Sequence, residues 1–218
     1  SYVYWVSRNT PYTIAKLALS LDGKMSGEGG KPVRLTSASA DALTHEYRQY
    51  SNALLTTART VLADNPQLNV RGEGSPLRKE VFVIDSRLEL SSELKLFSAT
   101  GPITLFCGEH VSEAQAERIA KVARIIRLPL DSQGQMNLTE VIKRIGALGI
   151  HQLLVESGGK LFCELVRQQL LNEAMLYLTP HWLGEKATFA FHGVNPVSTA
   201  RRVQWSQHDP DAVCHLFF

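Results

Sequence analysis

Two kinds of segment alternate along the chain. Short apolar runs without polar alternation are typical of strands that are buried on both faces. They occur at positions 12–21, 53–55, 81–85, 103–106, 125–126, 153–155 and 174–179. Between them, apolar residues recur at helical spacing, most clearly where Asn137 caps a segment that Gly149 ends. This alternation predicts an α/β fold with three layers, in which helices cover both faces of a mainly parallel sheet.

The last two apolar-rich runs are of another kind. Positions 203–207 and 212–218 flank the turn residues Asp209-Pro210-Asp211, which indicates a closing hairpin. The sheet is therefore expected to have an antiparallel edge at its C-terminal end. We find no linker or internal repeat, and the 218 residues are expected to form a single domain.

Local signals predict where two further helices begin. Thr36-Ser37 would cap a helix that runs to about position 50. Ser112, with Gln115 three residues later, makes a capping box for a helix to about position 122. By contrast, positions 27–32 and 72–76, which are rich in glycine and proline, are expected to be loops.

A glycine turn follows the strand expected at 153–155. Glu156-Ser157 precede Gly158-Gly159, which open a helical pattern that includes Leu161, Leu165 and Leu170. Backbone N–H groups at such a helix start favour an anionic ligand, although two glycines also suit a simple tight connection. Ser157 does not form the nucleophile elbow of a serine hydrolase, because Val155 stands where that motif needs glycine.

Two cations have both a structural and a functional interpretation. Lys16 is the one charge within the first strand, so its stem packs while its ammonium reaches either solvent or a ligand's phosphate or carboxylate. Arg48 lies near the end of a predicted helix, where it complements the helix dipole even without a ligand. The residues alone leave both alternatives open.

Charge and composition narrow the class of partner. A net charge of +2, from 23 basic and 21 acidic residues, gives no field that attracts nucleic acid or membranes, so a small molecule is the expected partner. No apolar run approaches the length of about 20 residues that spans a bilayer. Three widely spaced cysteines indicate reduced thiols and a cytoplasmic protein. The cysteines and histidines lack metal-ligand spacing, so no metal is expected.

Several separated motifs together resemble one family, the reductase domain of bacterial riboflavin biosynthesis. They are Lys-Leu-Ala-Leu-Ser-Leu-Asp-Gly-Lys at 16–24, Thr-Val-Leu-Ala-Asp-Asn-Pro-Gln-Leu-Asn-Val-Arg at 60–71, Val-Ile-Asp-Ser at 83–86 and Val-Glu-Ser-Gly-Gly at 155–159. Pro-His-Trp-Leu-Gly at 180–184 is similar to the family's Ala-Pro-x-Leu-Leu-Gly. This domain is the C-terminal half of a bifunctional pyrimidine deaminase/reductase. Its fold is similar to that of dihydrofolate reductase.

The resemblance implies an activity and a set of site residues. The activity is NADPH-dependent reduction of the ribosylamino side chain of 5-amino-6-(5-phospho-ribosylamino)uracil, a phosphorylated pyrimidine, by a homodimer. Glu156 would accept hydrogen bonds from the substrate at the reacting centre, with Lys16 beside it as the second catalytic residue. Arg48, Leu68 and Arg71 would line the substrate. The cofactor-binding residues would be Ser20, Thr60, Asp64, Ser86, Gly158, Gly159, Lys160 and Leu161.

The chain also departs from the family pattern. The family has Ser and Trp where this sequence has Pro32 and Arg34, so we keep as alternatives a paralogous reductase of a related pyrimidine or pteridine-like substrate and a nucleotide-binding module without catalysis. The cysteine pair of the zinc deaminase half is missing, so we expect a reductase domain without the deaminase, either as a stand-alone reductase or as a piece of a longer bifunctional chain. As a separate hypothesis, Arg87 would bind the 2′-phosphate of NADPH.

Overall fold

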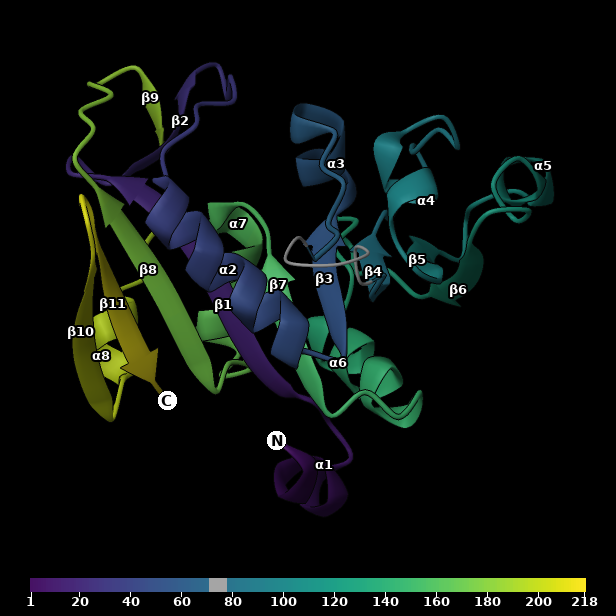
Figure 1. Ribbon diagram of the computed structural model, residues 1–218. Helices are drawn as coiled ribbons and strands as arrows, with labels where there is room; N and C mark the ends of the chain where they lie inside the picture. The colour runs from purple at the N-terminus through teal and green to yellow at the C-terminus, as the bar shows by residue number, and fades with distance from the viewer. Residues whose placement is uncertain (71–77) are drawn as a thin grey trace. The chain divides into compact units, whose positions relative to one another are not determined.

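The computed structural model describes residues 1–70 and 78–218 and divides the chain into two compact units (Figure 1). Unit 1 comprises Ser1–Pro11 and Arg48–Leu153, and unit 2 comprises Tyr12–Tyr47 and Leu154–Phe218. Arg71 and the loop predicted at 72–76 lie outside the described residues. The prediction of a single domain stays a prediction.

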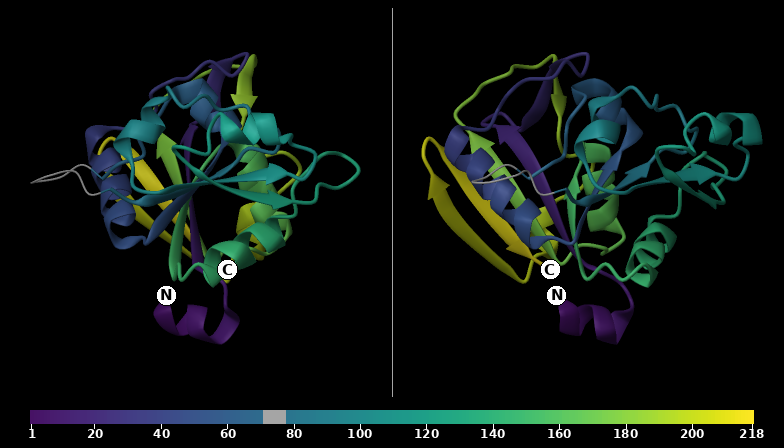
Figure 2. Two further views of the ribbon diagram at one scale, coloured as in Figure 1. Left: turned by 90° about the vertical axis from the view of Figure 1, so that its right-hand side faces the viewer. Right: turned by 45° about the vertical axis from the view of Figure 1, so that its right-hand side comes forward.

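Unit 2 contains a sheet with both kinds of strand pairing. β1 (Tyr12–Ser20) runs parallel to β8 (Glu173–Thr179). β11 (Asp211–Phe217) pairs antiparallel with β8 on one side and with β10 (Arg202–His208) on the other. The β10–β11 hairpin, yellow in Figure 2, is the predicted antiparallel C-terminal edge, which is confirmed.

Helices cover both faces of this sheet. Figure 1 shows α2 (Ala38–Tyr50) in front of β1 and β8 and α7 (Gly159–Arg167) behind them. Thr44 of α2 hydrogen-bonds the Tyr177 hydroxyl of β8 at 3.3 Å. On the other face, α7 buries an apolar stripe (Leu161, Phe162, Leu165 and Val166). α7 ends at Arg167, so the helical pattern extended to Leu170 was too long.

A small second sheet in unit 2 was not predicted. β2 (Lys24–Glu28) pairs antiparallel with β9 (Ala187–Phe189), with register shifts along the pair. Gly27 and Glu28 therefore belong to a strand, and the prediction of a loop over 27–32 was wrong at these two positions. Glycine is a poor strand former on its own, but pairing with a distant segment overrides that local preference. The short helix α8 (Pro196–Thr199) completes the unit.

Unit 1 contains a run of parallel strands. β3 (Ala53–Thr57), β4 (Glu80–Ile84), β5 (Ile103–Gly108) and β6 (Arg124–Leu128) each pair parallel with the next. The middle strands are mostly apolar and buried, with Val81, Phe82 and Val83 all at 0% exposure. β7 (Gln152–Glu156) begins in unit 1 and ends in unit 2. The predicted mainly parallel α/β fold is confirmed.

The helices of unit 1 follow their local signals to different extents. In α6 (Leu138–Ala147), the Asn137 side chain accepts from the Glu140 amide at 3.1 Å, and Gly149 follows at a φ of 86°. Both predicted ends are confirmed. α5 (Glu113–Glu117) has the predicted capping box, but separate turns replace the helix before position 122, so its predicted length was wrong. α3 (Ala58–Asp64) and α4 (Lys95–Ala99) are similarly short.

α1 (Tyr2–Arg8) was not predicted, and every one of its residues stays at least partly exposed. The helix is anchored by Trp5, whose Nε1 donates to the carbonyl of Gly146 at 2.8 Å. The Trp5 ring also packs on His151, with 4.3 Å between the ring centroids. A helix of seven residues is too short to be stable by itself, so these tertiary contacts hold it. The local sequence pattern therefore did not predict it.

Cys107, Cys163 and Cys214 are buried free thiols, as predicted for reduced core cysteines. Within residues 1–70 and 78–218, no helix is long and apolar enough to cross a membrane.

Candidate active site

The strand, turn and helix predicted around Gly158 are present in unit 2. β7 ends at Glu156, Gly158 is the N-cap with extended backbone (φ −75°, ψ 170°), and α7 begins at Gly159. The first backbone N–H groups of α7, which have no partner within the helix, therefore belong to Gly159, Lys160 and Leu161. Lys160 is exposed, whereas the Leu161 side chain is 8% exposed, so Leu161 offers a ligand its backbone N–H rather than its side chain.

The two glycines of this turn have different structural reasons. A Cβ on Gly159 would lie 2.0 Å from the carbonyl oxygen of Ala190, so the close approach of that backbone requires glycine. A Cβ on Gly158 would meet only the Cε of Met25, at 3.3 Å. Packing thus explains Gly159 without any ligand.

Met25 contacts the start of α7 directly. Its Sδ accepts a hydrogen bond from the backbone N–H of Gly159, with 3.2 Å between the two atoms. A thioether is a weak acceptor compared with a phosphate oxygen. One amide of the expected phosphate site therefore already has a protein acceptor, although a weak one.

Lys16 and Glu156 share a neighbour in unit 2, the tyrosine of β8. The Nζ of Lys16 lies over the ring of Tyr177, 4.9 Å from its centroid. Tyr177 is fully buried. Burial raises the pKa of its hydroxyl, and the negative charge of Glu156 raises that pKa further against the opposing hydrogen bond with Thr44. The two predicted catalytic residues are thus brought near the same aromatic ring.

Ser20 is the buried last residue of β1. Its hydroxyl donates to the Oδ1 of Asp22 at 2.5 Å and accepts from the Lys24 amide at 3.0 Å. Asp22 also accepts from the amides of Leu183 (3.1 Å) and Gly184 (2.8 Å). Desolvation alone would raise the pKa of Asp22, but these hydrogen bonds outweigh it and hold the pKa below its ordinary value. Asp22 therefore ties the β1–β2 turn to the segment 180–184.

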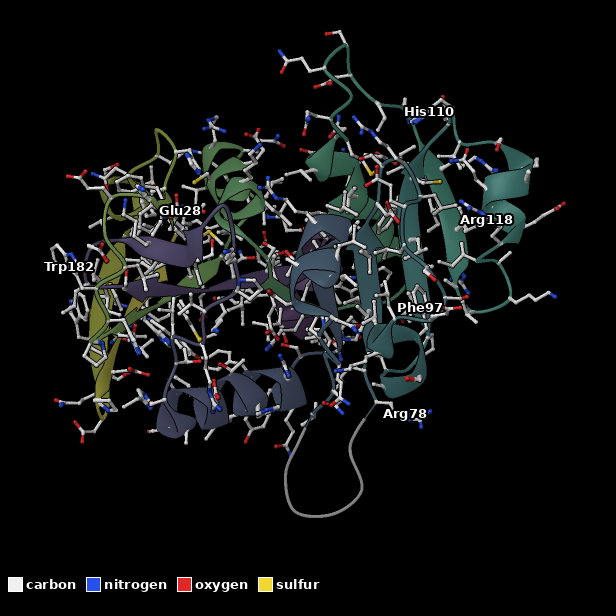
Figure 3. All side chains as sticks on the ribbon, turned by 90° about the horizontal axis from the view of Figure 1, so that it is seen from above. Glu28, Arg78, Phe97, His110, Arg118 and Trp182 are labelled. Carbon is white, nitrogen blue, oxygen red and sulfur yellow. The ribbon has the colours of Figure 1, made fainter. Side chains whose placement is uncertain are left out.

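That segment presents Trp182 to solvent. The residue is 74% exposed and lies at the periphery of the side chains drawn in Figure 3. Gly184 adopts a φ of 81°, which favours glycine. The hydrogen bonds that Leu183 and Gly184 donate to Asp22, together with the left-handed glycine, account for the position of this loop.

The predicted substrate residues of unit 1 form a local group. Arg48 donates from Nη1 to the carbonyl of Asn69 at 2.9 Å. Leu68, next to Asn69, has a left-handed backbone (φ 46°) and a side chain only 5% exposed. A left-handed leucine is uncommon and is typical of a functional or tightly constrained segment. Arg71 lies outside the described residues.

Thr60 and Asp64 lie on α3, as predicted. The Thr60 amide donates to the Thr57 side chain, the N-cap of α3, at 3.3 Å, and the left-handed Asn65 ends the helix. Thr60 and Asp64 are four positions apart in this helix, so the two predicted cofactor residues lie on the same face.

Ser86 follows β4 in a turn that Asp85 organises. The Asp85 carboxylate is 2% exposed and accepts from the amides of Glu89 (2.9 Å) and Leu90 (3.1 Å). Burial raises the pKa of Asp85, and the hydrogen bonds from these backbone amides offset part of that increase. The next residue, Arg87, has an exposed side chain and lies 3.7 Å from the Glu89 carboxylate.

The segment that departs from the family pattern lies in unit 2. The Arg34 guanidinium pairs with Asp41 of α2 at 3.2 Å, and Thr36 donates to the same carboxylate at 2.6 Å. The Arg34 side chain is 78% exposed. Among the described residues, no cluster of three or more His, Cys, Asp or Glu side chains is arranged to hold a metal ion.

Two solved structures place the fold. RibD from Acinetobacter baumannii superposes with a TM-score of 0.81 and 22% identity, covering 99% of this chain and 60% of that one. Dihydrofolate reductase from Enterococcus faecalis superposes with a TM-score of 0.51 and 12% identity, covering 94% and 95%. The fold is thus the dihydrofolate reductase-like α/β fold.

The chain belongs to the RibD C-terminal domain family, which matches residues 11–214. The riboflavin biosynthesis protein RibD of Chlamydia trachomatis is 31% identical over 192 residues, which are 85% of this chain. This chain spans only half the length of that relative. The 2,5-diamino-6-ribosylamino-4(3H)-pyrimidinone 5′-phosphate reductase of Archaeoglobus fulgidus is 27% identical over 186 residues, covering 80% of this chain and 82% of the relative.

Three residues of the site had no predicted role. Asp22 stands in a motif that marked only a turn, and Tyr177 lies within an apolar run that indicated only a buried strand. Met25 is 134 positions from the amide it contacts, so no local pattern pointed to it.

Proposed function

We propose that the chain is an NADPH-dependent reductase of riboflavin biosynthesis. It would convert the ribosylamino side chain of 5-amino-6-(5-phospho-ribosylamino)uracil into the ribitylamino form. The proposal is supported by membership of the RibD C-terminal domain family over residues 11–214. The single structural observation that carries it is the grouping of Lys16 and Glu156 about Tyr177 in unit 2.

The start of α7 fits the pyrophosphate of a dinucleotide chemically. Its donors are the backbone N–H groups of Gly159, Lys160 and Leu161 with the exposed Lys160 ammonium, and its first turn carries no carboxylate. Thr60, Asp64 and Ser86 are the further residues that we assign to the cofactor, and Ser20 would contribute through the turn it holds. When bound, NADPH supplies the hydride.

Reduction of the ring-opened sugar imine requires a hydride on C1 and a proton on the neighbouring nitrogen. We assign delivery of that proton to Lys16, whose ammonium lies over the ring of Tyr177. Glu156 would accept hydrogen bonds from the substrate and orient the reacting nitrogen. Arg48 and Arg71 suit the ribose phosphate, because guanidinium groups bind phosphate through paired hydrogen bonds, and Leu68 would line the pyrimidine.

A second substrate is a specific alternative. The Archaeoglobus relative is named for a diaminopyrimidinone phosphate, which carries an amino group where the uracil carries an oxygen. Pro32 and Arg34 replace two residues of the family pattern, and this difference is compatible with either pyrimidine. The alternative changes the ring that is recognised and leaves the reduction of the side chain the same.

The test follows the loss of NADPH absorbance with each of the two pyrimidine phosphates. Turnover with the aminouracil at a kcat/KM at least tenfold higher supports the proposal, and the reverse ratio supports the diaminopyrimidinone. Lys16→Met and Glu156→Gln serve as controls with strongly reduced turnover. NADPH binding without turnover of either pyrimidine would identify a nucleotide-binding module, and no binding of NADPH would remove the enzymatic proposal.

We further propose that Arg87 binds the 2′-phosphate of NADPH. Its guanidinium is exposed and only loosely paired with Glu89, so it is available to a second anion. Arg87→Ala should bring the kcat/KM for NADPH close to that for NADH, and an unchanged preference for NADPH would refute this assignment.

We propose, finally, that residues 1–218 act as one reductase domain in a cytoplasmic homodimer. The buried free thiols agree with a reducing compartment. The side chains of β10 are exposed along nearly its whole length, so this edge strand is available to a second copy. Light scattering of the purified protein tests the dimer, and a monomer at micromolar concentration would exclude it.

A further inference from the structure

We propose that Tyr177 is a positioning residue that holds the ammonium of Lys16 on the face of its ring. The inference rests on the proposed function, because it assigns to Tyr177 a part in the reduction through Lys16. It differs from the assignment of Lys16 itself, which came from the family motif.

Strand pairing brings the two residues together. In the parallel pair of β1 and β8, Ala18 stands opposite Tyr177, and Lys16 stands opposite Met175. Residues two apart along a strand point to the same face, so Lys16 is the diagonal neighbour of Tyr177. Ala18 between them carries only a methyl group, and this leaves the ring face open to the long lysine side chain.

The ring itself is fixed in orientation. Tyr177 is fully buried, and its hydroxyl lies 3.3 Å from the Oγ1 of Thr44 on α2. Thr44 is in turn 3.1 Å from the carbonyl of Ala40 one turn earlier in the helix. The backbone of β8 and the hydroxyl contact with α2 therefore hold the tyrosine at two points.

A fixed aromatic face restrains a lysine because of its charge distribution. The face of the ring is negative, so it attracts an ammonium at distances up to about 6 Å, and the attraction is stronger away from water. The 4.9 Å between the Lys16 Nζ and the ring centroid is within this range. The side chain of lysine is a flexible four-carbon stem, so this restraint limits the positions from which its ammonium can donate a proton.

Glu156 also acts on this tyrosine, through its charge. Burial is the main cause of the raised pKa of the Tyr177 hydroxyl, and the negative charge of Glu156 raises that pKa further. The ring therefore carries the Lys16 ammonium on its face, while its hydroxyl lies within the electrostatic field of Glu156. Its removal should impair turnover while leaving the amides of α7 and the dinucleotide contacts in place.

The experiment compares Tyr177→Phe with Tyr177→Leu in the full chain, assayed for pyrimidine reduction and for NADPH binding. Tyr177→Phe keeps the ring and should retain kcat within about twofold. Tyr177→Leu removes the ring and should lower kcat about tenfold, with the KM for NADPH unchanged within about twofold. The phenylalanine variant is thus the matched control for loss of the hydroxyl and its bond to Thr44.

A double-mutant cycle separates positioning from general loss of packing. Single-turnover assays of Lys16→Met should show the same rate with and without Tyr177→Leu, because the ring acts only through the lysine. Equal losses in the two backgrounds would overturn the inference, as would a Tyr177→Phe variant as slow as Tyr177→Leu. Thermal unfolding and NADPH titration establish that each variant is folded. If the wild-type chain reduces neither pyrimidine, the proposed function fails first and this inference falls with it.

Discussion

The sulfur of Met25 accepts a hydrogen bond from the backbone N–H of Gly159 at 3.2 Å. This contact joins the small β2–β9 sheet to the first turn of α7, where the proposed pyrophosphate would bind. A phosphate oxygen is a stronger acceptor than a thioether, so an incoming dinucleotide would displace the methionine from this amide.

Met25→Leu is therefore expected to tighten NADPH binding. Leucine keeps the side-chain volume but cannot accept a hydrogen bond from the Gly159 N–H. The dinucleotide then no longer competes with a side chain for this donor. A weak neutral hydrogen bond contributes about 0.6 kcal/mol, which corresponds to about a threefold lower Kd. Fluorescence titration measures this, with the buried Met175→Leu as control. Unchanged or weaker binding by Met25→Leu would show that the sulfur does not compete with the ligand.

The two turn glycines should respond differently to a single methyl group. Gly159→Ala places a Cβ against the Ala190 carbonyl and should lower the free energy of unfolding by more than about 2 kcal/mol. Gly158→Ala meets only the flexible end of Met25 and should cost less than about 1 kcal/mol. Urea unfolding of the two variants decides the matter, and equal stability losses would contradict the close backbone approach at Gly159.

Asp22 should stabilise the protein only where its carboxylate is ionised. Its pKa is lowered in the folded state, so its contribution is complete above the unfolded value of about 3.8 and is lost as the pH falls through the lower folded value. Asp22→Asn should therefore lower the melting temperature at pH 7, and the difference from wild type should shrink below about pH 4. Asp209→Asn, at an exposed turn position, is the control. A difference that persists at pH 3 would argue against the hydrogen bonds to Leu183 and Gly184 as its origin.

Glu156→Gln should reduce turnover much more than cofactor affinity. Loss of a proton-handling or orienting carboxylate costs about 100-fold in kcat, while the amides of α7 that we assign to the pyrophosphate are unchanged. Steady-state kinetics and NADPH titration measure the two quantities separately, with Glu117→Gln as the exposed control. An unchanged kcat, or a loss that lies wholly in NADPH affinity, would remove Glu156 from the substrate side.

Elements with complete local signals were predicted well. Asn137 and Gly149 determine both ends of α6 within the element itself, and the Asp209-Pro210 turn marks the hairpin. α1 and the β2–β9 pair were missed for the opposite reason. The first depends on Trp5 docking on Gly146, and the second joins segments about 160 positions apart. Contacts between such distant positions leave no periodic pattern in the sequence.

In the candidate site, too, residues within local motifs were predicted and residues brought in by distant contacts were missed. Lys16, Glu156 and the glycine turn stand in motifs of consecutive residues, so their types and spacing were visible. Their neighbours were not, because the Tyr177 ring reaches Lys16 only through the register of β1 and β8. The close approach of Ala190 to Gly159 likewise arises from a loop that follows the glycine by about 30 residues.

The buried cysteines are distributed over both units. Cys107 lies in β5 of unit 1, whereas Cys163 and Cys214 lie in α7 and β11 of unit 2. Burial raises the pKa of Cys107 and of Cys214, so both thiols are poor nucleophiles while the fold is closed. Each unit thus contains at least one buried thiol that reacts only after local unfolding. The order in which a thiol-reactive dye labels these sulfurs would show which unit unfolds first.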